Sequence, residues 1–333
     1  MPFSTDATPP GVDIAAIEDA ARRLAGEAVE TPLLESELLN RRVGGRLLVK
    51  AEPLQRTGSF KFRGAYTKIS RLDLAVRARG VIAFSSGNHA QGVAAAAAAF
   101  GIPATIVMPA DAPAIKRRNT EALGATVVPY DRWREDREAI GAELVERTGA
   151  SLVRPYDDPD VIAGQGTVGL EIAARCATLG LRPDAVLVCC GGGGLTAGVA
   201  TALADRLPGV PVHAVEPEGG DDTARSLAAG ERLANPPGGP RLCDALLSPM
   251  PGEVTFPINR RLGVTGLVVS EAEVIDAMRA AFEHLKLVLE PGGAVSLAAA
   301  LSGRVLTQGR TVVAVASGGN VDPATYARCL SAD

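Results

Sequence analysis

The chain has 333 residues, of which 47% are apolar, 22% charged and 4% aromatic. This length fits about two domains of ordinary size, and the composition is that of a globular protein with a substantial core rather than a disordered chain. Because the formal charge is −4 and no basic cluster is longer than residues 116–118, nucleic acid is not expected as a partner. The longest apolar stretch, residues 93–108, is interrupted by Gly101 and Pro103, which argues against a membrane-spanning helix of about 20 residues.

From residue 46 onward, short β-branched runs alternate with alanine- and leucine-rich segments of helical period. This alternation predicts an α/β protein with parallel sheets. The predicted strands are residues 47–50, 81–84, 104–108, 126–129, 185–189, 212–215, 266–269 and 311–316. The predicted helices are residues 13–24, 65–72, 90–100, 114–123, 135–148, 162–178, 196–207, 271–285 and 295–301. Residues 80–157 hold complete βα units of their own, so we expect them to form a small domain, with residues 1–79 and 158–333 as a large, cofactor-binding domain.

Cysteine usage indicates a reducing compartment. The five cysteines form no CxxC pair, and their odd number argues against a disulfide framework. We therefore expect buried, reduced thiols in a cytoplasmic protein.

The catalytic side chains that are present argue against several common hydrolases. None of the three histidines lies in an HExxH motif or a histidine cluster, so a zinc hydrolase is not expected. No GxSxG motif occurs, and no lysine follows a glycine, so the GxxxxGK[ST] phosphate loop is missing as well. What remains is a set of glycine-bracketed polar turns at predicted strand ends, where open parallel sheets bind their ligands.

One such turn is a run of four glycines, Gly191 to Gly194, between a predicted strand and a predicted helix. Glycines let the backbone approach a ligand closely, and the N–H groups at a helix N-terminus favour an anion, so we expect a phosphate here. The same run also contains Gly192-x-Gly194-x-x-Ala197, with Glu216 about 20 residues further on, which is the dinucleotide fingerprint. An NAD-dependent oxidoreductase is therefore the alternative from a different class of enzyme.

Lys61 is a candidate nucleophile. Lysine is scarce, with five lysines among 34 basic residues, and Lys61 lies between Gly58 and Gly64 in a turn. We expect Ser59 to cap the helix that follows. The helix dipole and the neighbouring phenylalanines, Phe60 and Phe62, would lower the pKa of the amine and free the lone pair that an imine-forming nucleophile needs.

Two further turns complete the set. Residues 85–89 follow a predicted strand and open an alanine-rich helix, so their N–H groups and hydroxyls suit a carboxylate. Residues 317–320 follow the last predicted strand. A phosphate cradle, an activated lysine and a carboxylate cradle together describe what an amino acid bound to pyridoxal 5′-phosphate requires.

Five motifs, in order along the chain, closely resemble those of the threonine/serine dehydratase and serine racemase family of fold-type II pyridoxal-phosphate enzymes. They are Ser59-Phe60-Lys61-Phe62-Arg63-Gly64-Ala65, Ser86-Gly87-Asn88-His89-Ala90-Gln91-Gly92, Ala163-Gly164-Gln165-Gly166-Thr167, Gly191 to Leu195, and Ser317-Gly318-Gly319-Asn320. The resemblance runs from about residue 13 to about residue 325 and displaces the NAD interpretation. It implies two open, mainly parallel twisted-sheet domains of the tryptophan synthase β-like kind, and it suggests a homodimer.

The resemblance also implies roles for individual residues. Lys61 would bind the cofactor covalently and take the α-proton of the substrate. The other implied cofactor-binding residues are Phe60, Asn88 for the ring hydroxyl, Gly191, Gly192, Gly193, Gly194 and Leu195 for the phosphate, and Ser317 for the pyridine nitrogen. The turn that would bind the substrate α-carboxylate consists of Ser85, Ser86, Gly87, Asn88 and His89. Ser86 also matches the residue that serves racemases of this family as acid and base on the opposite face of the substrate.

Two further sites are implied less directly. Glu216, Gly220 and Asp222 resemble the divalent-cation loop of serine racemases, and two carboxylates with a carbonyl suit Mg²⁺ or Ca²⁺, with a solvated acidic turn as the alternative. Arg137 aligns with an arginine that in this family could meet a β-carboxylate, as 3-hydroxyaspartate would present. Its charged surroundings, residues 131–138, favour the alternative of a solvated, salt-bridged helix face.

We therefore expect a dehydratase that converts L-threonine or L-serine into a 2-oxo acid and ammonia. Serine racemisation and 3-hydroxyaspartate dehydration on the same site are the alternatives. Tyr156 leaves this choice open, because dehydratases of this family commonly carry phenylalanine there and serine racemases a polar residue.

Overall fold

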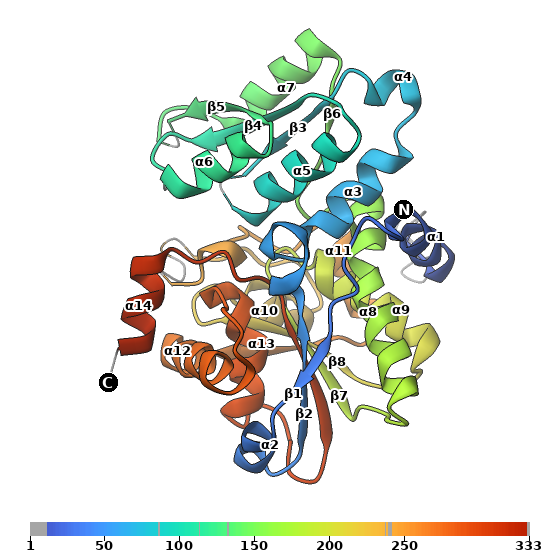
Figure 1. Cartoon of the computed structure of the whole chain (residues 1–333), viewed down its shortest axis with the longest axis vertical. Coiled ribbons are helices and arrows are strands. Elements are labelled where there is room, and N and C mark those ends of the chain that lie inside the picture. The colour runs from blue at the N-terminus through green and yellow to red at the C-terminus, as the bar shows by residue number, and fades with distance from the viewer. Residues whose placement is uncertain are drawn as a thin grey trace.

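The computed structural model describes residues 12–85, 87–112, 114–131, 133–236, 238 and 242–331, apart from the side chain of Ile115. These residues fold into one six-stranded and one four-stranded sheet, stacked end to end along the long axis of the molecule (Figure 1). The prediction of an α/β protein with two mainly parallel sheets is confirmed.

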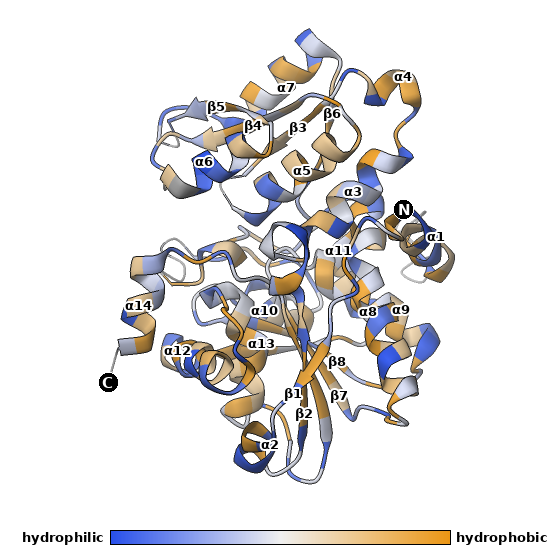
Figure 2. Cartoon of the chain, viewed as in Figure 1, coloured by the Kyte–Doolittle hydropathy of each residue, from blue (hydrophilic) through white to orange (hydrophobic). Residues whose placement is uncertain are grey.

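The six-stranded sheet has the strand order β1-β2-β10-β7-β8-β9, and every neighbouring pair is parallel except β1 with β2. Its central strands are buried on both faces, as their continuous aliphatic sequences require, and Figure 2 shows them as largely hydrophobic. The strands are β1 (Leu33–Glu35), β2 (Arg46–Ala51), β7 (Ala185–Cys189), β8 (Val212–Pro217), β9 (Thr265–Val269) and β10 (Thr311–Ala316).

Helices cover both faces of this sheet. One face carries α2 (Glu37–Val43), α12 (Glu271–Ala280), α13 (Pro291–Leu301) and α14 (Pro323–Ser331). The other face carries α8 (Pro159–Thr178) and α9 (Gly194–Arg206). Around them lie α1 (Ile14–Leu24), α10 (Asp222–Ala229) and α11 (Thr255–Arg261).

The four-stranded sheet is parallel throughout, in the order β5-β4-β3-β6. Its strands are β3 (Val81–Phe84), β4 (Ala104–Pro109), β5 (Thr126–Tyr130) and β6 (Ser151–Leu152). One face packs against α3 (Lys61–Arg71) and α5 (Asn88–Ala99), the other against α7 (Arg137–Thr148), with α4 (Leu74–Arg77) and α6 (Ala114–Ala122) in the connections. The whole sheet comes from within residues 80–157, although the domain boundaries themselves stay a prediction.

The predicted strands and helices are all present, but several helices begin earlier than expected. Helix α3 begins at Lys61, and the prediction that Ser59 caps it is wrong: Phe60 is the N-cap residue. Ser59 instead forms a strand-like bridge with Gly318, and its hydroxyl is buried without a hydrogen-bond partner. The backbone pairing has replaced the cap.

The elements that sequence patterns missed are short. They are β1, β6, α2, α4, α10, α11 and α14, none longer than nine residues. The five cysteines are buried and free, as predicted. Within the described residues, no helix is both long enough and apolar enough to span a membrane.

Candidate active site

The carboxyl ends of β3, β7 and β10 lead into one cavity of about 240 Å³, which the first turn of α3 also lines. Ligands of open α/β sheets bind at such strand ends. The predicted site residues that line this cavity are Phe60, Lys61, Ser85, Gly87, Asn88, His89, Arg137, Gly191, Gly192, Gly193, Gly194, Leu195 and Ser317. Ser86 lies outside the described residues, and the predicted metal ligands lie elsewhere.

The glycine run forms an anion cradle at the start of α9. The backbone N–H groups from Gly192 to Leu195 donate no hydrogen bond to any described residue. Gly193 has a φ of 89°, a conformation that favours glycine, and a Cβ at Gly192 would lie 2.3 Å from the ring of Tyr156. Side chains are therefore excluded here, and the free N–H groups can bind a phosphate.

Two side chains of α11 hold this loop from behind. The Thr255 hydroxyl donates to the carbonyl oxygen of Gly192 at 2.6 Å, and the Asn259 amide donates to that of Gly193 at 3.4 Å. Both side chains are buried. By occupying the carbonyl oxygens, they fix the orientation of the peptide planes that carry the N–H groups.

Lys61 extends from the first turn of α3 into the cavity. Its Nζ donates a hydrogen bond to the carbonyl oxygen of Pro155 at 2.7 Å and lies 5.0 Å from the centre of the Phe60 ring. Burial lowers the pKa of the Lys61 amine to about 8, although the charge of Glu290 acts in the opposite direction. Phe62, which we also expected to desolvate the amine, packs into the core against Tyr66 instead. The neutral, nucleophilic amine is thus accessible near physiological pH.

Asn320, Asn88 and Glu290 form a hydrogen-bonded chain along the cavity. The Asn320 Nδ2 donates at 2.7 Å both to the carbonyl oxygen of Thr57 and to the Asn88 Oδ1. The Asn88 Nδ2 donates to the Glu290 Oε1 at 2.5 Å. Because a backbone carbonyl only accepts, this chain fixes how both amides are oriented. Burial raises the pKa of Glu290 to about 7, so its carboxyl can hold or release a proton near neutral pH.

In the turn after β3, the Ser85 Oγ accepts the N–H of Gly87 at 3.1 Å, and the turn leads directly into α5. The imidazole of His89 faces away from this turn, with its Nε2 2.8 Å from the carbonyl oxygen of Val153. Burial, together with the charge of Lys61, lowers the pKa of His89 to about 3, so the ring is neutral. A substrate carboxylate would therefore meet the backbone N–H groups of the turn and not an imidazolium.

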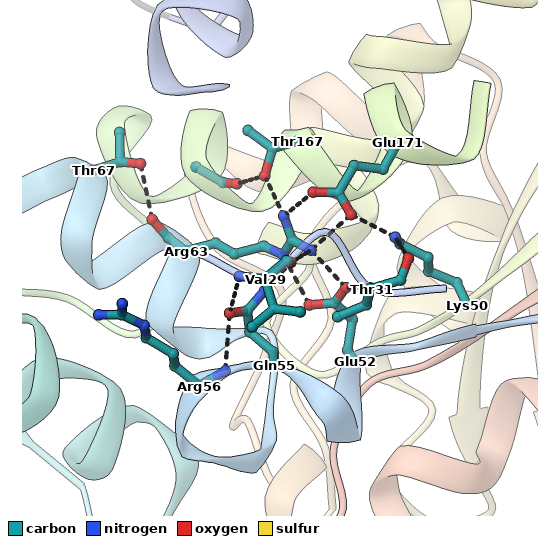
Figure 3. A network of polar contacts seen from close by, with 11 residues as sticks. Val29, Thr31, Lys50, Glu52, Gln55, Arg56, Arg63, Thr67, Thr167 and Glu171 are labelled. Atoms are coloured by element: carbon teal, nitrogen blue, oxygen red, sulfur yellow. Dashed lines mark hydrogen bonds and ion pairs between the residues drawn. The ribbon is translucent and has the colours of Figure 1, made fainter. Parts of the chain in front are cut away.

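Buried charges anchor the helix that carries Lys61 (Figure 3). Arg63 donates to Glu52 at 2.8 and 2.9 Å and to Glu171 at 2.5 and 2.8 Å. Lys50 donates to Glu171 at 2.5 Å, so two positive charges balance two negative ones. Although burial opposes it, the charge of Arg63 lowers the pKa of Glu52. The cluster ties α3 to β2 and α8, and with them to the large sheet.

Arg137 begins α7 and lines the cavity from the side of the small sheet. Its neighbour Asp136 caps the helix by accepting the N–H of Glu138 at 2.8 Å, and Arg134 lies 3.7 Å from Asp131. Arg137 itself makes no hydrogen bond or ion pair with any described residue. Its guanidinium is therefore free to bind an anion in the cavity.

Glu216 is the second-last residue of β8 and Asp222 is the first residue of α10, and both side chains are buried. Glu216 accepts the N–H groups of Thr223 and Ala224 at 3.0 and 2.7 Å. Asn235 donates to the Asp222 Oδ1 at 2.6 Å, while the Oδ2 is buried without a partner. Burial raises the pKa of both carboxyls, that of Asp222 to about 6.

This pair is chemically suited to a hard divalent cation, since an unpartnered carboxylate oxygen lies beside a second buried carboxyl. Gly220, the third predicted ligand, lies between them in the chain. No group of three or more His, Cys, Asp or Glu side chains in the described part of the chain forms a metal-binding cluster.

Sequence patterns missed Glu290, Asn320, Thr255 and Asn259. A signal existed for Glu290, which is the one charged residue in the apolar stretch 287–295 and precedes the proline that begins α13. Asn320 ends the Ser317-Gly318-Gly319-Asn320 motif, but only the fold shows that it donates to Thr57 and Asn88. Thr255 and Asn259 gave no signal, because α11 was not predicted.

The donor set fits pyridoxal phosphate, the cofactor that the motifs imply. The free N–H groups of the glycine run suit its phosphate, and the amine of Lys61 suits its aldehyde. The Asn88 amide suits its ring oxygen, and Ser317, which follows β10, suits its pyridine nitrogen.

Comparison with known proteins agrees with this geometry. The family model described as "Pyridoxal-phosphate dependent enzyme" matches residues 24–318. The chain is 45% identical over 313 residues to an L-threo-3-hydroxyaspartate ammonia-lyase of Pseudomonas sp, covering 93% of this chain and 96% of the relative. It is 42% identical over 314 residues to an L-threo-3-hydroxyaspartate ammonia-lyase of Saccharomyces cerevisiae, covering 94% of each. Among solved structures, a threonine deaminase of T.th. superposes with a TM-score of 0.87 at 45% identity, covering 93% of this chain and 99% of that one.

Proposed function

The chain belongs to the family of pyridoxal-phosphate dependent enzymes, as an ammonia-lyase of the threonine/serine dehydratase type, and we propose that its substrate is L-threo-3-hydroxyaspartate. The observation that carries this choice is the unpaired Arg137 in the cavity that also holds Lys61. Serine and threonine have no β-carboxylate for this guanidinium to bind. The two similar ammonia-lyases named for 3-hydroxyaspartate support the same alternative over the threonine or serine substrate expected from the sequence.

Different residues of this chain bind the cofactor and the two carboxylates of the substrate. Pyridoxal phosphate, when bound, supplies an electron sink for the charge that removal of the α-proton leaves on the substrate. The N–H groups of residues 192–195 would hold its phosphate, and the amine of Lys61 would bind its aldehyde carbon. The N–H groups at the start of α5 would bind the α-carboxylate, and the Arg137 guanidinium would bind the β-carboxylate.

Proton transfer falls to Lys61 and Glu290. The lowered pKa of Lys61 lets its amine take the α-proton at neutral pH. Glu290, with a pKa of about 7, holds a proton beside Asn88. Loss of the β-hydroxyl and hydrolysis of the released product give a 2-oxo dicarboxylic acid and ammonia. The acid and base role implied for Ser86 stays a prediction, as does the homodimer.

The test is release of 2-oxo acid from both 3-hydroxyaspartate diastereomers, L-threonine and L-serine, by the wild type and by Arg137→Gln. Loss of one charge-assisted pair should lower kcat/KM for L-threo-3-hydroxyaspartate by about 10- to 150-fold. The values for serine and threonine should change by less than about threefold, because neither substrate uses the guanidinium.

Arg134→Gln is the matched control, since Arg134 is 86% exposed and points away into solvent beside Asp131. It should leave all four rates unchanged. A wild type that prefers serine or threonine over both diastereomers refutes the proposed substrate. Equal losses on every substrate in Arg137→Gln refute the proposed role of Arg137.

We also propose that Glu216 and Asp222, with the Gly220 carbonyl, bind Mg²⁺ or Ca²⁺ as a structural ion. The support is the unpartnered Asp222 oxygen and the raised pKa values of the two carboxyls, which a cation would lower.

A further inference from the structure

A second cavity, of about 560 Å³, adjoins the cavity that holds Lys61. The residues that line both are Phe84, Arg137, Pro155, Tyr156 and Pro249. Tyr156 therefore lies at the junction between the outer cavity and the catalytic lysine, next to Arg137.

The structure holds Tyr156 firmly at this junction. Its ring packs on the glycine loop, 2.3 Å from where a Cβ of residue 192 would lie. On one side, the carbonyl oxygen of Pro155 accepts the hydrogen bond from Lys61. On the other, Asp157 accepts the N–H groups of Glu253 and Val254 at 2.9 and 2.8 Å. The ring and the backbone of Tyr156 both pack closely on the glycine loop, the ring at Gly192 and the backbone at Gly194.

The Tyr156 hydroxyl and the Arg137 guanidinium are both available to a ligand. Neither makes a hydrogen bond with any residue that the structure describes. Burial raises the pKa of Tyr156 while the charge of Arg137 opposes this, so the hydroxyl stays protonated and lies within the field of the guanidinium. A protonated hydroxyl and a guanidinium are both donors that suit a carboxylate.

The surrounding acidic groups do not compete for these donors. Asp157 is occupied by backbone N–H groups, and Glu253 pairs with Arg232 at 3.2 Å. Glu138 lines the outer cavity, and no ion pair joins it to Arg137 among the described residues. In the inner cavity, Glu290 accepts the Asn88 amide and Asp244 pairs with Lys116. An incoming carboxylate at the junction therefore meets unpaired donors.

We propose that Tyr156 is a specificity-determining residue, whose hydroxyl donates a hydrogen bond to the same β-carboxylate that Arg137 binds. The proposal rests on the proposed function and names the second half of its carboxylate site. Phenylalanine at this position would keep the packing on the glycine loop and lose only the hydroxyl. A site that hydrogen-bonds a substrate group discriminates against substrates that lack this group, because its donors are then left unpaired.

The test uses holoenzyme with Tyr156→Phe, and Tyr326→Phe as the control, since Tyr326 lies on α14 away from both cavities. For L-threo-3-hydroxyaspartate we expect kcat/KM to fall by about 10- to 100-fold in Tyr156→Phe, and for L-serine by less than about threefold. The absorbance of the bound cofactor should be unchanged, which shows that the cofactor site is intact.

A binding measurement separates this proposal from the proposed function. L-Aspartate carries both carboxylates but has no β-hydroxyl to eliminate, and L-alanine carries only the α-carboxylate. Their dissociation constants can be measured from the change in cofactor absorbance. Tyr156→Phe should weaken L-aspartate by about 10- to 100-fold and L-alanine by less than about threefold. In Arg137→Gln/Tyr156→Phe the loss should be smaller than the product of the single losses, because both residues bind one carboxylate.

The outcomes differ for the two proposals. If the wild type prefers serine but Tyr156→Phe still weakens L-aspartate selectively, the substrate proposal fails and the role of Tyr156 stands. If Tyr156→Phe leaves L-aspartate binding unchanged, or weakens L-alanine equally, the role of Tyr156 is refuted whatever the substrate is.

Discussion

Replacement of Arg63 by methionine tests whether the buried charge cluster fixes the helix that begins with Lys61. Arg63 is 1% exposed and Glu52 is fully buried. The substitution removes both charge-assisted hydrogen bonds of Glu52 with Arg63. It leaves the carboxylate the Thr31 hydroxyl at 2.5 Å as hydrogen-bond partner and Lys50 as the remaining nearby positive charge. Glu171 is 19% exposed and keeps Lys50, so it loses less. Breaking a buried pair from one side costs about 3 to 5 kcal/mol, and we expect Arg63→Met to lower the free energy of unfolding by that amount.

Guanidinium unfolding of the apoenzyme at pH 7, followed by circular dichroism, measures this loss. The pKa of Glu52 is lowered from 4.5, so its contribution to stability is fully present above that pH and is lost only as the pH falls below it. The effect is therefore complete at pH 7. In the same protein, covalent attachment of pyridoxal phosphate to Lys61 should slow, because the first turn of α3 is no longer anchored.

Two further variants make the result decisive. Arg41→Met breaks an exposed i,i+4 pair with Glu37 and should cost less than about 1 kcal/mol. Glu52→Gln combined with Arg63→Met removes both charges and should recover about 0.5 to 3 kcal/mol relative to the sum of the single losses. If Arg63→Met costs no more than Arg41→Met, or if the losses simply add, the cluster does not anchor α3.

Three more predictions follow from the cofactor site and the proposed ion site. The rate of covalent cofactor attachment to the apoenzyme should rise with pH through a midpoint of about 8, because burial lowers the pKa of Lys61 from 10.5. Stopped-flow absorbance measures this rate, and a midpoint near 10.5 would contradict the burial argument. Gly192→Ala should weaken the binding of pyridoxal phosphate at least about fivefold in a fluorescence titration, because the new Cβ would collide with the Tyr156 ring. An unchanged affinity would show that the loop tolerates a side chain. Mg²⁺ at 100 times its dissociation constant should stabilise the wild type by about 2.7 kcal/mol, which is measured as a rise in Tm. Asp222→Asn should abolish this rise, because it removes the unpartnered carboxylate oxygen. A wild-type Tm that neither Mg²⁺ nor Ca²⁺ changes excludes the ion site.

Much of the fold follows from local pattern. The alternation of β-branched runs with helical segments predicted every strand of the sheets except the two shortest, β1 and β6. The glycine run and Lys61 were recognisable because close backbone approach to a ligand, or a lone lysine beside glycines, constrains residue type at one position. The role predicted for Ser317 came from the family resemblance alone. The same locality explains the error at Ser59, whose hydroxyl matched a cap while its backbone paired with residue 318.

The sequence by itself determined the α/β class, and it predicted a cofactor cradle at the glycine run and Lys61 as the nucleophile, because each depends on residues that are neighbours in the chain. Only the tertiary structure decided that Asn320 orients Asn88, that Glu290 faces this amide, and that Arg137 stays unpaired beside Tyr156. These contacts join segments about 20 to 230 residues apart. A hydrogen bond or an uncompensated charge depends on distance in space, and no periodicity in the chain records which distant segments the sheets bring together.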